Sequence, residues 1–229
     1  LLLLIARKGA SACTFTPDPN GFYPAGVAMV VAENSTMLCT TRRSCQDGVI
    51  RGCHTVICAG DSACWGTQVL EVPEGGRVRC EAGASLGCNS LIIEPTPEAT
   101  GTIEVECQGT CRDLVASGVL TLTATGTNTF MTILDIPDGG VVNCLEGTLS
   151  CGFATISVVK EDSQSTADSE PSVSVNCLGA TSCDGATMTV GPAGVVDCAG
   201  SCEATIHGAK TIDCSAAFSS SGASILSLS

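Results

Sequence analysis

The sequence predicts an all-β fold, a right-handed parallel β-helix (solenoid) of about seven irregular coils stapled by disulfides. Three features indicate it. The chain has 17 cysteines among 229 residues, a V-x-C segment recurs along it, and a Gly-containing loop leads from each such segment to a second cysteine. Fixed motifs separated by elastic gaps are typical of solenoids, because insertions leave the stack as loops at one edge.

The cysteines fall into two columns when the chain is aligned on the V-x-C segments. The first column holds Cys39, Cys58, Cys80, Cys107, Cys144, Cys177, Cys198 and Cys214. The second column holds Cys45, Cys64, Cys88, Cys111, Cys151, Cys183 and Cys202.

Two disulfide patterns fit these columns. In the first, each loop is closed within its own coil, as in Cys58–Cys64, Cys107–Cys111, Cys177–Cys183 and Cys198–Cys202. A bridge between neighbouring coils, such as Cys58–Cys80, also fits, because a stacking distance of about 4.8 Å allows disulfide geometry. Cys53 breaks the two-column pattern, and the sequence predicts that it pairs with Cys13 or with Cys214.

Alternation predicts the strands. In V-x-C the valine and the cysteine point inward and the middle residue points to water. These outward residues are Arg79, Glu106, Asn143, Asn176, Asp197 and Asp213. A second strand follows the second cysteine, with Ile156, Met188 and Ile206 as an internal ladder and Thr155, Thr187 and Thr205 outside. Turns such as P-E-G-G and P-D-G-G supply glycine for sharp corners. Whether each coil has two or three faces stays open.

The predicted organisation has four regions. Residues 1–12 form an apolar arm and residues 13–36 an N-terminal cap with the first strands. The cysteine-rich solenoid covers 37–216, and a C-terminal strand or tail covers 217–229.

Composition limits the location and the partners. Disulfides persist in oxidising compartments, so the sequence predicts a secreted protein. The cysteine gaps are irregular and the only histidines are His54 and His207, so no metal site and no cofactor is predicted. A net charge of −13 argues against nucleic acid and anionic membranes. No apolar run reaches the roughly 20 residues of a membrane span, so no membrane insertion is expected.

The recurring C-x-G-x-x-S-C element, followed by A-T-I, covers roughly residues 37–216. In this element the chain resembles cysteine-rich β-helical repeat proteins on the surfaces of protists and algae. The resemblance implies a surface repeat protein and brings no catalytic residue with it. The irregular coil lengths depart from a regular array.

No catalytic residue is predicted, and the chain is not expected to be an enzyme. Parallel β-helix enzymes that cleave acidic polysaccharides need clustered acids on one face. Asp197 and Asp213 share an outward position, for which an ordinary solvated face is the favoured interpretation. A nucleophile at Cys53, next to His54, would need a free thiol of low pKa, and a disulfide is favoured instead.

The run TLTATGTNT and the row Thr155, Thr187 and Thr205 resemble the threonine faces of ice-binding solenoids. Such a face needs threonine ranks over several coils, but the earlier counterparts of this row are Gln68, Ile92 and Val115. The high β-propensity of threonine explains the other threonines of these strands.

Covalent glycans are expected. Asn34 begins the sequon Asn34-Ser35-Thr36. The Ser/Thr/Pro-rich segments 94–102 and 160–172 are O-glycan carriers or flexible loops.

The two ends suggest assembly, because a solenoid exposes open strand edges. The C-terminus alternates, with Leu226 and Leu228 on one side. The N-terminus begins with an apolar run and two cations. These N-terminal residues are Leu1, Leu2, Leu3, Leu4, Ile5, Arg7 and Lys8. The run is expected to dock as a strand, either on its own chain or on the next one.

Charge is split along the chain. Residues 1–112 hold eight Lys/Arg and 11 Asp/Glu, a net of −3, whereas residues 113–229 hold two and 12, a net of −10. Copies joined head to tail would repel each other less at such a seam. The favoured function is therefore a structural extracellular repeat protein, a subunit of a head-to-tail fibre or surface coat built from copies of itself. The alternative is a carbohydrate-binding or polysaccharide-cleaving β-helix monomer, and the third is an ice-binding or adhesin solenoid.

Overall fold

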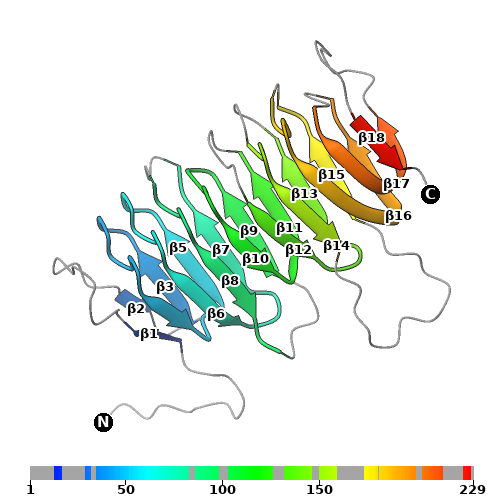
Figure 1. Cartoon of the computed structure of the whole chain (residues 1–229). Coiled ribbons are helices and arrows are strands. Elements are labelled where there is room, and N and C mark those ends of the chain that lie inside the picture. Colours follow the sequence, from blue (N-terminus) through cyan, green and yellow to red (C-terminus); the bar gives the residue numbers. More distant parts are fainter. Residues whose placement is uncertain are drawn as a thin grey trace, which may run out of the picture.

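The structure is a computed structural model, and it is an all-β solenoid with many disulfides, as the sequence predicts (Figure 1). It describes residues 13–16, 29–31, 35–82, 86–97, 103–125, 132–145, 150–158, 173–179, 181–199, 203–213 and 224–227. For 29–31, Leu120 and 224–227 only the backbone is described. The described residues form strands and turns and no helix. None of them therefore belongs to a helix that is long and apolar enough to span a bilayer.

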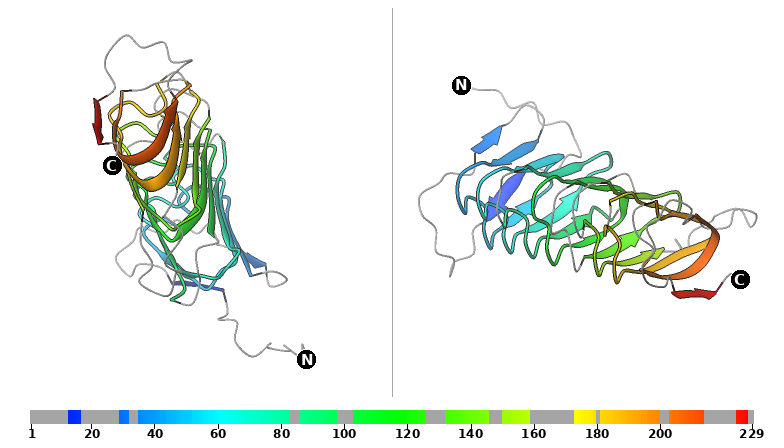
Figure 2. Two further views of the ribbon diagram at one scale, coloured as in Figure 1. Left: turned by 90° about the vertical axis from the view of Figure 1, so that its right-hand side faces the viewer. Right: turned by 90° about the horizontal axis from the view of Figure 1, so that it is seen from above.

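Each coil contributes one strand to each of two parallel sheets. Sheet 1 consists of β3 (Thr36–Cys39), β5 (Thr55–Cys58), β7 (Arg77–Cys80), β9 (Ile103–Cys107), β11 (Val119–Ala124), β13 (Val141–Cys144), β15 (Ser174–Cys177) and the second halves of β16 (Thr187–Asp197) and β17 (Thr205–Asp213). Sheet 2 consists of β4 (Val49–Arg51), β6 (Gln68–Val72), β8 (Ile92–Pro95), β10 (Val115–Ser117), β12 (Ile133–Ile136), β14 (Thr155–Val158), the first halves of β16 and β17, and β18 (Ser224–Ser227). Figure 2 shows these ranks following one another along the rod.

The predicted alternation is confirmed. In β5 and β13 the burial alternates between half-buried and buried, so that the valine and cysteine of each V-x-C segment point into the core. Ile156, Met188 and Ile206 are at most 1% exposed and lie in register on neighbouring strands of sheet 2. A period of two places every second side chain on the buried face, which is why these short segments form strands.

A third side of each coil is made of turns. Each coil therefore has two faces made of strands and one side made of turns, which settles the number of faces that the sequence left open. Backbone hydrogen bonds also link this side from coil to coil, for example from Cys45 N to the Ala63 carbonyl at 2.8 Å and from Cys64 N to the Gly87 carbonyl at 2.8 Å. One corner repeats in every coil closed by two described cysteines. The residue two places after the second cysteine has a positive φ, at Asp47, Gly66, Ser90, Asp113, Phe153 and Gly185.

One coil carries no cysteine. Between Cys107 and Cys144 the ladder of sheet 1 inserts a further rank, in which Ala124 pairs with Cys107 on one side and Cys144 on the other. The prediction of about seven coils was made from cysteine spacing and therefore omits this coil. Ala124 and Leu122 are fully buried, so the core continues through this rank without sulfur.

Two short antiparallel strands close the N-terminal end. β1 (Thr14–Thr16) pairs with β4, and β2 (Met29–Val31) pairs with β3. All other strand pairs among the described residues are parallel. We call β1 and β2 the N-terminal cap. They lie at the end of the rod opposite to β18 (Figure 1).

Candidate functional site

The structure closes the six described pairs of the two cysteine columns within their own coils. The pairs are Cys39–Cys45, Cys58–Cys64, Cys80–Cys88, Cys107–Cys111, Cys144–Cys151 and Cys177–Cys183, with Cα–Cα distances between 5.8 and 6.2 Å. Of the two patterns that fit the sequence, this is the loop-closing one. Cys198 is buried in the first column, while its expected partner Cys202 lies outside the described residues, as does Cys214.

The disulfides form a sulfur column inside the rod. At three places sulfurs of neighbouring coils lie within 4.8 Å of one another. These groups are Cys39 with Cys58 and Cys64, Cys80 with Cys88 and Cys111, and Cys144 with Cys177 and Cys183. Metal binding needs the thiolate, whereas every sulfur in these groups is already bonded to another sulfur. The column therefore acts as a structural staple in the oxidised protein.

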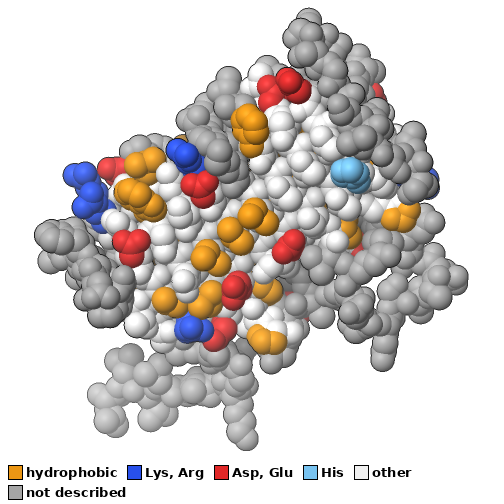
Figure 3. All heavy atoms as spheres, viewed as in Figure 1, with side chains coloured by type: hydrophobic (Ala, Val, Ile, Leu, Met, Phe, Trp, Pro, Cys, Tyr) orange, Lys and Arg blue, Asp and Glu red, His pale blue; other side chains and the backbone are white. Residues whose placement is uncertain are grey.

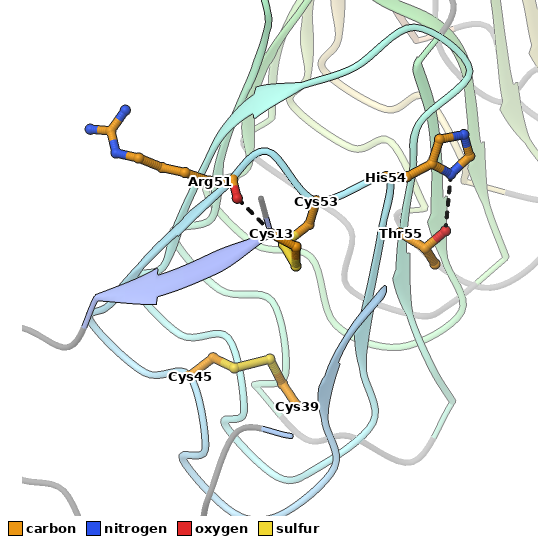
Figure 4. The surroundings of a disulfide bond; sticks show 7 residues. All are labelled: Cys13, Cys39, Cys45, Arg51, Cys53, His54 and Thr55. Atoms are coloured by element: carbon orange, nitrogen blue, oxygen red, sulfur yellow. Dashed lines mark hydrogen bonds between the residues drawn. A yellow bond between two sulfur atoms is a disulfide. The ribbon is translucent and has the colours of Figure 1, made fainter. Parts of the chain in front are cut away.

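The disulfide Cys13–Cys53 is of another kind. It joins β1 to the segment after β4 across 40 residues of sequence, and it leaves no thiol at Cys53 for a Cys–His nucleophile. Figure 4 shows His54 turned away from this disulfide toward Thr55, with Nδ1 3.4 Å from the threonine hydroxyl. Of the two partners expected for Cys53, the structure selects Cys13 because β1 lies antiparallel on β4.

A polar groove crosses the outer face of sheet 1 over β7, β9 and β11. Its volume is about 240 Å³, and it is lined by Arg77, Glu104, Val105, Glu106, Thr121 and Thr123. The alternation of β7 and β9 brings the charged residues out, and the parallel register sets Arg77 beside Glu104 and Arg79 beside Glu106. The sequence had indicated Arg79 and Glu106 only as outward residues, because nothing local shows that the two strands are neighbours.

Two ion-pair networks involve the glutamates that line the groove. Arg77 donates to Glu104, and Arg79 Nε lies 3.5 Å from a Glu106 carboxylate oxygen and 3.9 Å from one of Glu81. Gln108 accepts from Arg79 at 3.3 Å and donates to Glu106. Each glutamate of the lining thus has an arginine partner, and the groove offers donors and acceptors at nearly balanced charge. That combination suits a neutral polyhydroxylated ligand better than acid–base chemistry.

Beyond the groove, the same outward column becomes uncharged and then acidic. Asn176 donates from Nδ2 to Asn143 Oδ1 at 2.7 Å across neighbouring strands. Asp197 and Asp213 follow in register, and Asp197 Oδ1 accepts from the Ala199 amide at 3.1 Å. This hydrogen bond closes a local turn, in keeping with the expected solvated face.

The outward column of sheet 2 contains the threonine row. Thr155, Thr187 and Thr205 are register neighbours, as expected, and the column begins with Val49, Gln68, Ile92, Val115 and Ile133. The described threonine row therefore spans three ranks and continues as aliphatic side chains, of which Val115 is 39% and Ile133 50% exposed. Figure 3 shows a face that is largely uncharged, on which basic side chains lie next to acidic ones.

Phe153 is an unexpected feature of the turn side. It is 57% exposed and holds a φ of 55°, although a bulky side chain disfavours this region. Its ring lies over Gly185 of the next coil, where an added Cβ would come within 2.6 Å of it. The position two residues after the second cysteine is the sequence signal that could have predicted this corner.

Several predicted site residues lie outside the described residues or lack a described side chain. Outside are the sequon residue Asn34, the arm residues Leu1 to Ile5 with Arg7 and Lys8, and Leu228. Leu226 lies in β18, of which only the backbone is described.

Comparison of the chain with models of known protein families, with curated proteins and with solved structures finds no match. The class of the protein is therefore defined by its own architecture, a disulfide-rich β-solenoid.

Proposed function

We propose that this chain is a structural subunit of an extracellular fibre or surface coat, in which copies join head to tail. The observation that carries the proposal is the unbroken parallel ladder, which runs through both sheets from β3 and β4 to β17 and β18. A stack of parallel strands leaves a backbone edge at each end, and the two edges are complementary; at the N-terminal end β1 and β2 lie on that edge.

The disulfides support an extracellular setting. Their cysteines in the six described coil pairs are at most 1% exposed, so the covalent staples are shielded from reductants in the folded rod. An oxidising compartment is where such bonds form and persist. The proposal assigns no enzymatic activity, and it includes glycans on Asn34 and on the Ser/Thr-rich segments as a coat that hinders proteases.

Negative-stain microscopy with light scattering over a concentration series tests the proposal. We expect unbranched filaments with an axial repeat of roughly 40 Å, the height of the strand ranks of one subunit at about 4.8 Å each. A heterologous contact of this kind propagates because it does not close on itself. A chain that stays monomeric at every concentration, both with the Cys13–Cys53 disulfide intact and after its reduction, contradicts the proposal.

The apolar arm has a place in the same proposal. Residues Leu1 to Ile5 are proposed to strengthen the junction by packing on the next subunit, together with Leu226 and Leu228 at the far end. Deleting residues 1–8 should then leave folded monomers that polymerise poorly, whereas unchanged fibres would assign the arm to its own chain.

A second candidate function is carbohydrate binding at the sheet 1 groove, favoured by its arginine, its two glutamates and its two threonines. Calorimetric titration with neutral and acidic oligosaccharides tests it. Arg77→Ala should weaken binding, while Arg51→Ala, which removes a comparable ion pair with Glu71 on sheet 2, should leave it unchanged. Equal binding by both variants would rule out the groove.

A further inference from the structure

The N-terminal cap covers the very edges that a second copy would need. β1 lies on the open edge of β4 and β2 on that of β3, and both run against the direction of every other described strand. A parallel solenoid continues only by adding parallel ranks, so an antiparallel strand terminates it.

β1 is anchored by two devices besides its three-residue pairing with β4. The Phe15 ring packs against the core and sits on Gly48, where an added Cβ would lie 2.2 Å from the ring. The disulfide Cys13–Cys53 ties the start of β1 to the segment after β4 (Figure 4). It is the one disulfide among the described residues that joins the cap to the solenoid.

Among the disulfides of the described residues, Cys13–Cys53, which we call the clasp, is also the most accessible. Cys13 is half-buried, whereas both cysteines of each coil-closing pair are at most 1% exposed. Cys53 itself is 1% exposed, so the partial exposure of Cys13 is what sets the clasp apart from the shielded coil disulfides as a target for a dithiol reductant.

We propose that the cap is a removable stopper clasped by Cys13–Cys53, and that the edges of β3 and β4 beneath it are the docking surface for the β17–β18 end of a second copy. This inference rests on the head-to-tail function proposed above, and it states how the formation of the junction between two copies is controlled.

The registers specify the junction. In sheet 1 the column that begins with Met37 ends with Ile212, and in sheet 2 the column that begins with Val49 ends with Ser224. Continuing each ladder by one rank sets Ile212 against Met37, and Ser224 against Val49, of the next copy. Met37 is fully buried beneath the cap, whereas Ile212 is only partly buried at the far end. The junction would therefore bury apolar side chains from both ends.

Charge also favours this pairing. Residues 35–66 hold three arginines and two aspartates, a net of +1. Residues 181–213 hold four acids and one lysine, a net of −3, and the three of them that are not described carry no charge. Opposite signs at the two ends steer association and reduce self-repulsion at the seam.

Opening the clasp is an ordinary thiol–disulfide exchange. A thiolate of the reductant attacks Sγ of Cys13, the S–S bond breaks, and Cys53 leaves as a thiolate that takes up a proton. The second thiol of the reductant then displaces the Cys13 sulfur, which also becomes a thiol. The dithiol is oxidised to its disulfide, and the chain gains two electrons and two protons.

The test compares assembly rates of the full chain at equal concentration by light scattering and microscopy. The Cys13→Ser/Cys53→Ser variant should assemble on the order of tenfold faster than the oxidised wild type. Without the disulfide, which closes a long loop, β1 is held on β4 only by its three paired residues and the Phe15 contact. Gly48→Ala, which pushes on the Phe15 ring, should assemble faster with the clasp intact. The matched control Cys144→Ser/Cys151→Ser removes a coil disulfide and should keep the wild-type rate.

Two further arms remove ambiguity. If the clasp variant does not fold, wild type given a brief dithiol pulse and then alkylated replaces it, with peptide mapping to show that only Cys13 and Cys53 are labelled. Adding Ile212→Asp to the uncapped chain should abolish the acceleration. Hydrogen exchange should show Val49–Arg51 exposed in uncapped monomers and protected in fibres.

The outcomes separate the two proposals. Wild type and uncapped chains that form fibres at the same rate overturn the stopper and leave the head-to-tail function standing. Acceleration that survives Ile212→Asp overturns the assigned docking surface. Uncapped chains with exposed β4 amides that never assemble overturn the head-to-tail function itself.

Discussion

Six described coils carry a disulfide between their cysteine columns, whereas the coil of β11 and β12 has no cysteine from Val119 to Ile136. From Thr121 to Ala124 the cysteine-free coil keeps the register of its neighbours, after a shift between Val119 and Thr121. Backbone hydrogen bonds run on through this coil, as from Leu145 N to the Ala124 carbonyl at 2.9 Å. The strand ladder and the buried columns therefore set the stack, and the disulfides limit how far each turn can open.

The two kinds of coil also differ in what lies inside and outside them. The cysteine-free coil buries the Thr132 hydroxyl, which has no hydrogen-bond partner among the described residues, in the column where the neighbouring coils have Leu114 and Ala154. Its outer face on sheet 1 carries Thr121 and Thr123 where β9 carries glutamates. We expect this coil to be the least stable of the described rod.

The largest effect is expected at Leu134, which is fully buried in the cysteine-free coil. Leu134→Ala should lower the free energy of unfolding by about 3 kcal/mol and open this coil locally, because no disulfide restrains it. Ile93→Ala, in the same column of a disulfide-closed coil, is the control with a similar global loss. Hydrogen exchange should rise in 119–125 and 132–136 only for Leu134→Ala, and equal local exchange in both variants would contradict the comparison.

The second largest effect is expected when a coil loses its disulfide. Cys144→Ala/Cys151→Ala removes a disulfide that closes seven residues and leaves alanine in the first column, as at Ala124. Loop entropy predicts a loss of about 2 kcal/mol in the free energy of unfolding, measured by denaturant titration. An unchanged midpoint would show that the disulfides add nothing to the ladder.

A matched pair of smaller changes probes the buried threonines. Thr132→Val removes a buried hydroxyl without a partner and should raise the free energy of unfolding by about 1 kcal/mol. Thr67→Val removes a hydroxyl that donates to the Cys45 carbonyl, so it should lower stability by a similar amount. Thermal melts of both variants measure these changes. A change in stability of the same sign in both variants would refute the explanation.

The smallest effect is expected on the outer face. Arg77→Ala breaks the exposed pair with Glu104 and should change the free energy of unfolding by about 0.5 kcal/mol or less, with the difference vanishing at high salt. Arg51→Ala breaks the corresponding exposed pair on sheet 2 and serves as the reference. A loss above about 1 kcal/mol would mean that the groove is a stability element.

Sequence reasoning reached the parts of the fold that local periodicity encodes. The V-x-C strands, the inner ladder of Ile156, Met188 and Ile206, and the threonine row opposite it all follow from a period of two. It omitted the coil at Ala124 because cysteine was the counting signal and alanine carries none. The groove was missed because Arg77 and Glu104 are 27 residues apart and become neighbours only through strand pairing.

Alternation and cysteine spacing are properties of each short segment, so they already specify a disulfide-rich solenoid. How the segments meet is visible only in the folded chain. In the folded chain the described column disulfides close within each coil and not between coils, and Cys53 pairs with Cys13. The strands β1 and β2 run antiparallel to β4 and β3. The physical reason is that pairing and direction depend on which edges lie side by side in space, and loop lengths that vary from coil to coil leave no trace of that in the local pattern.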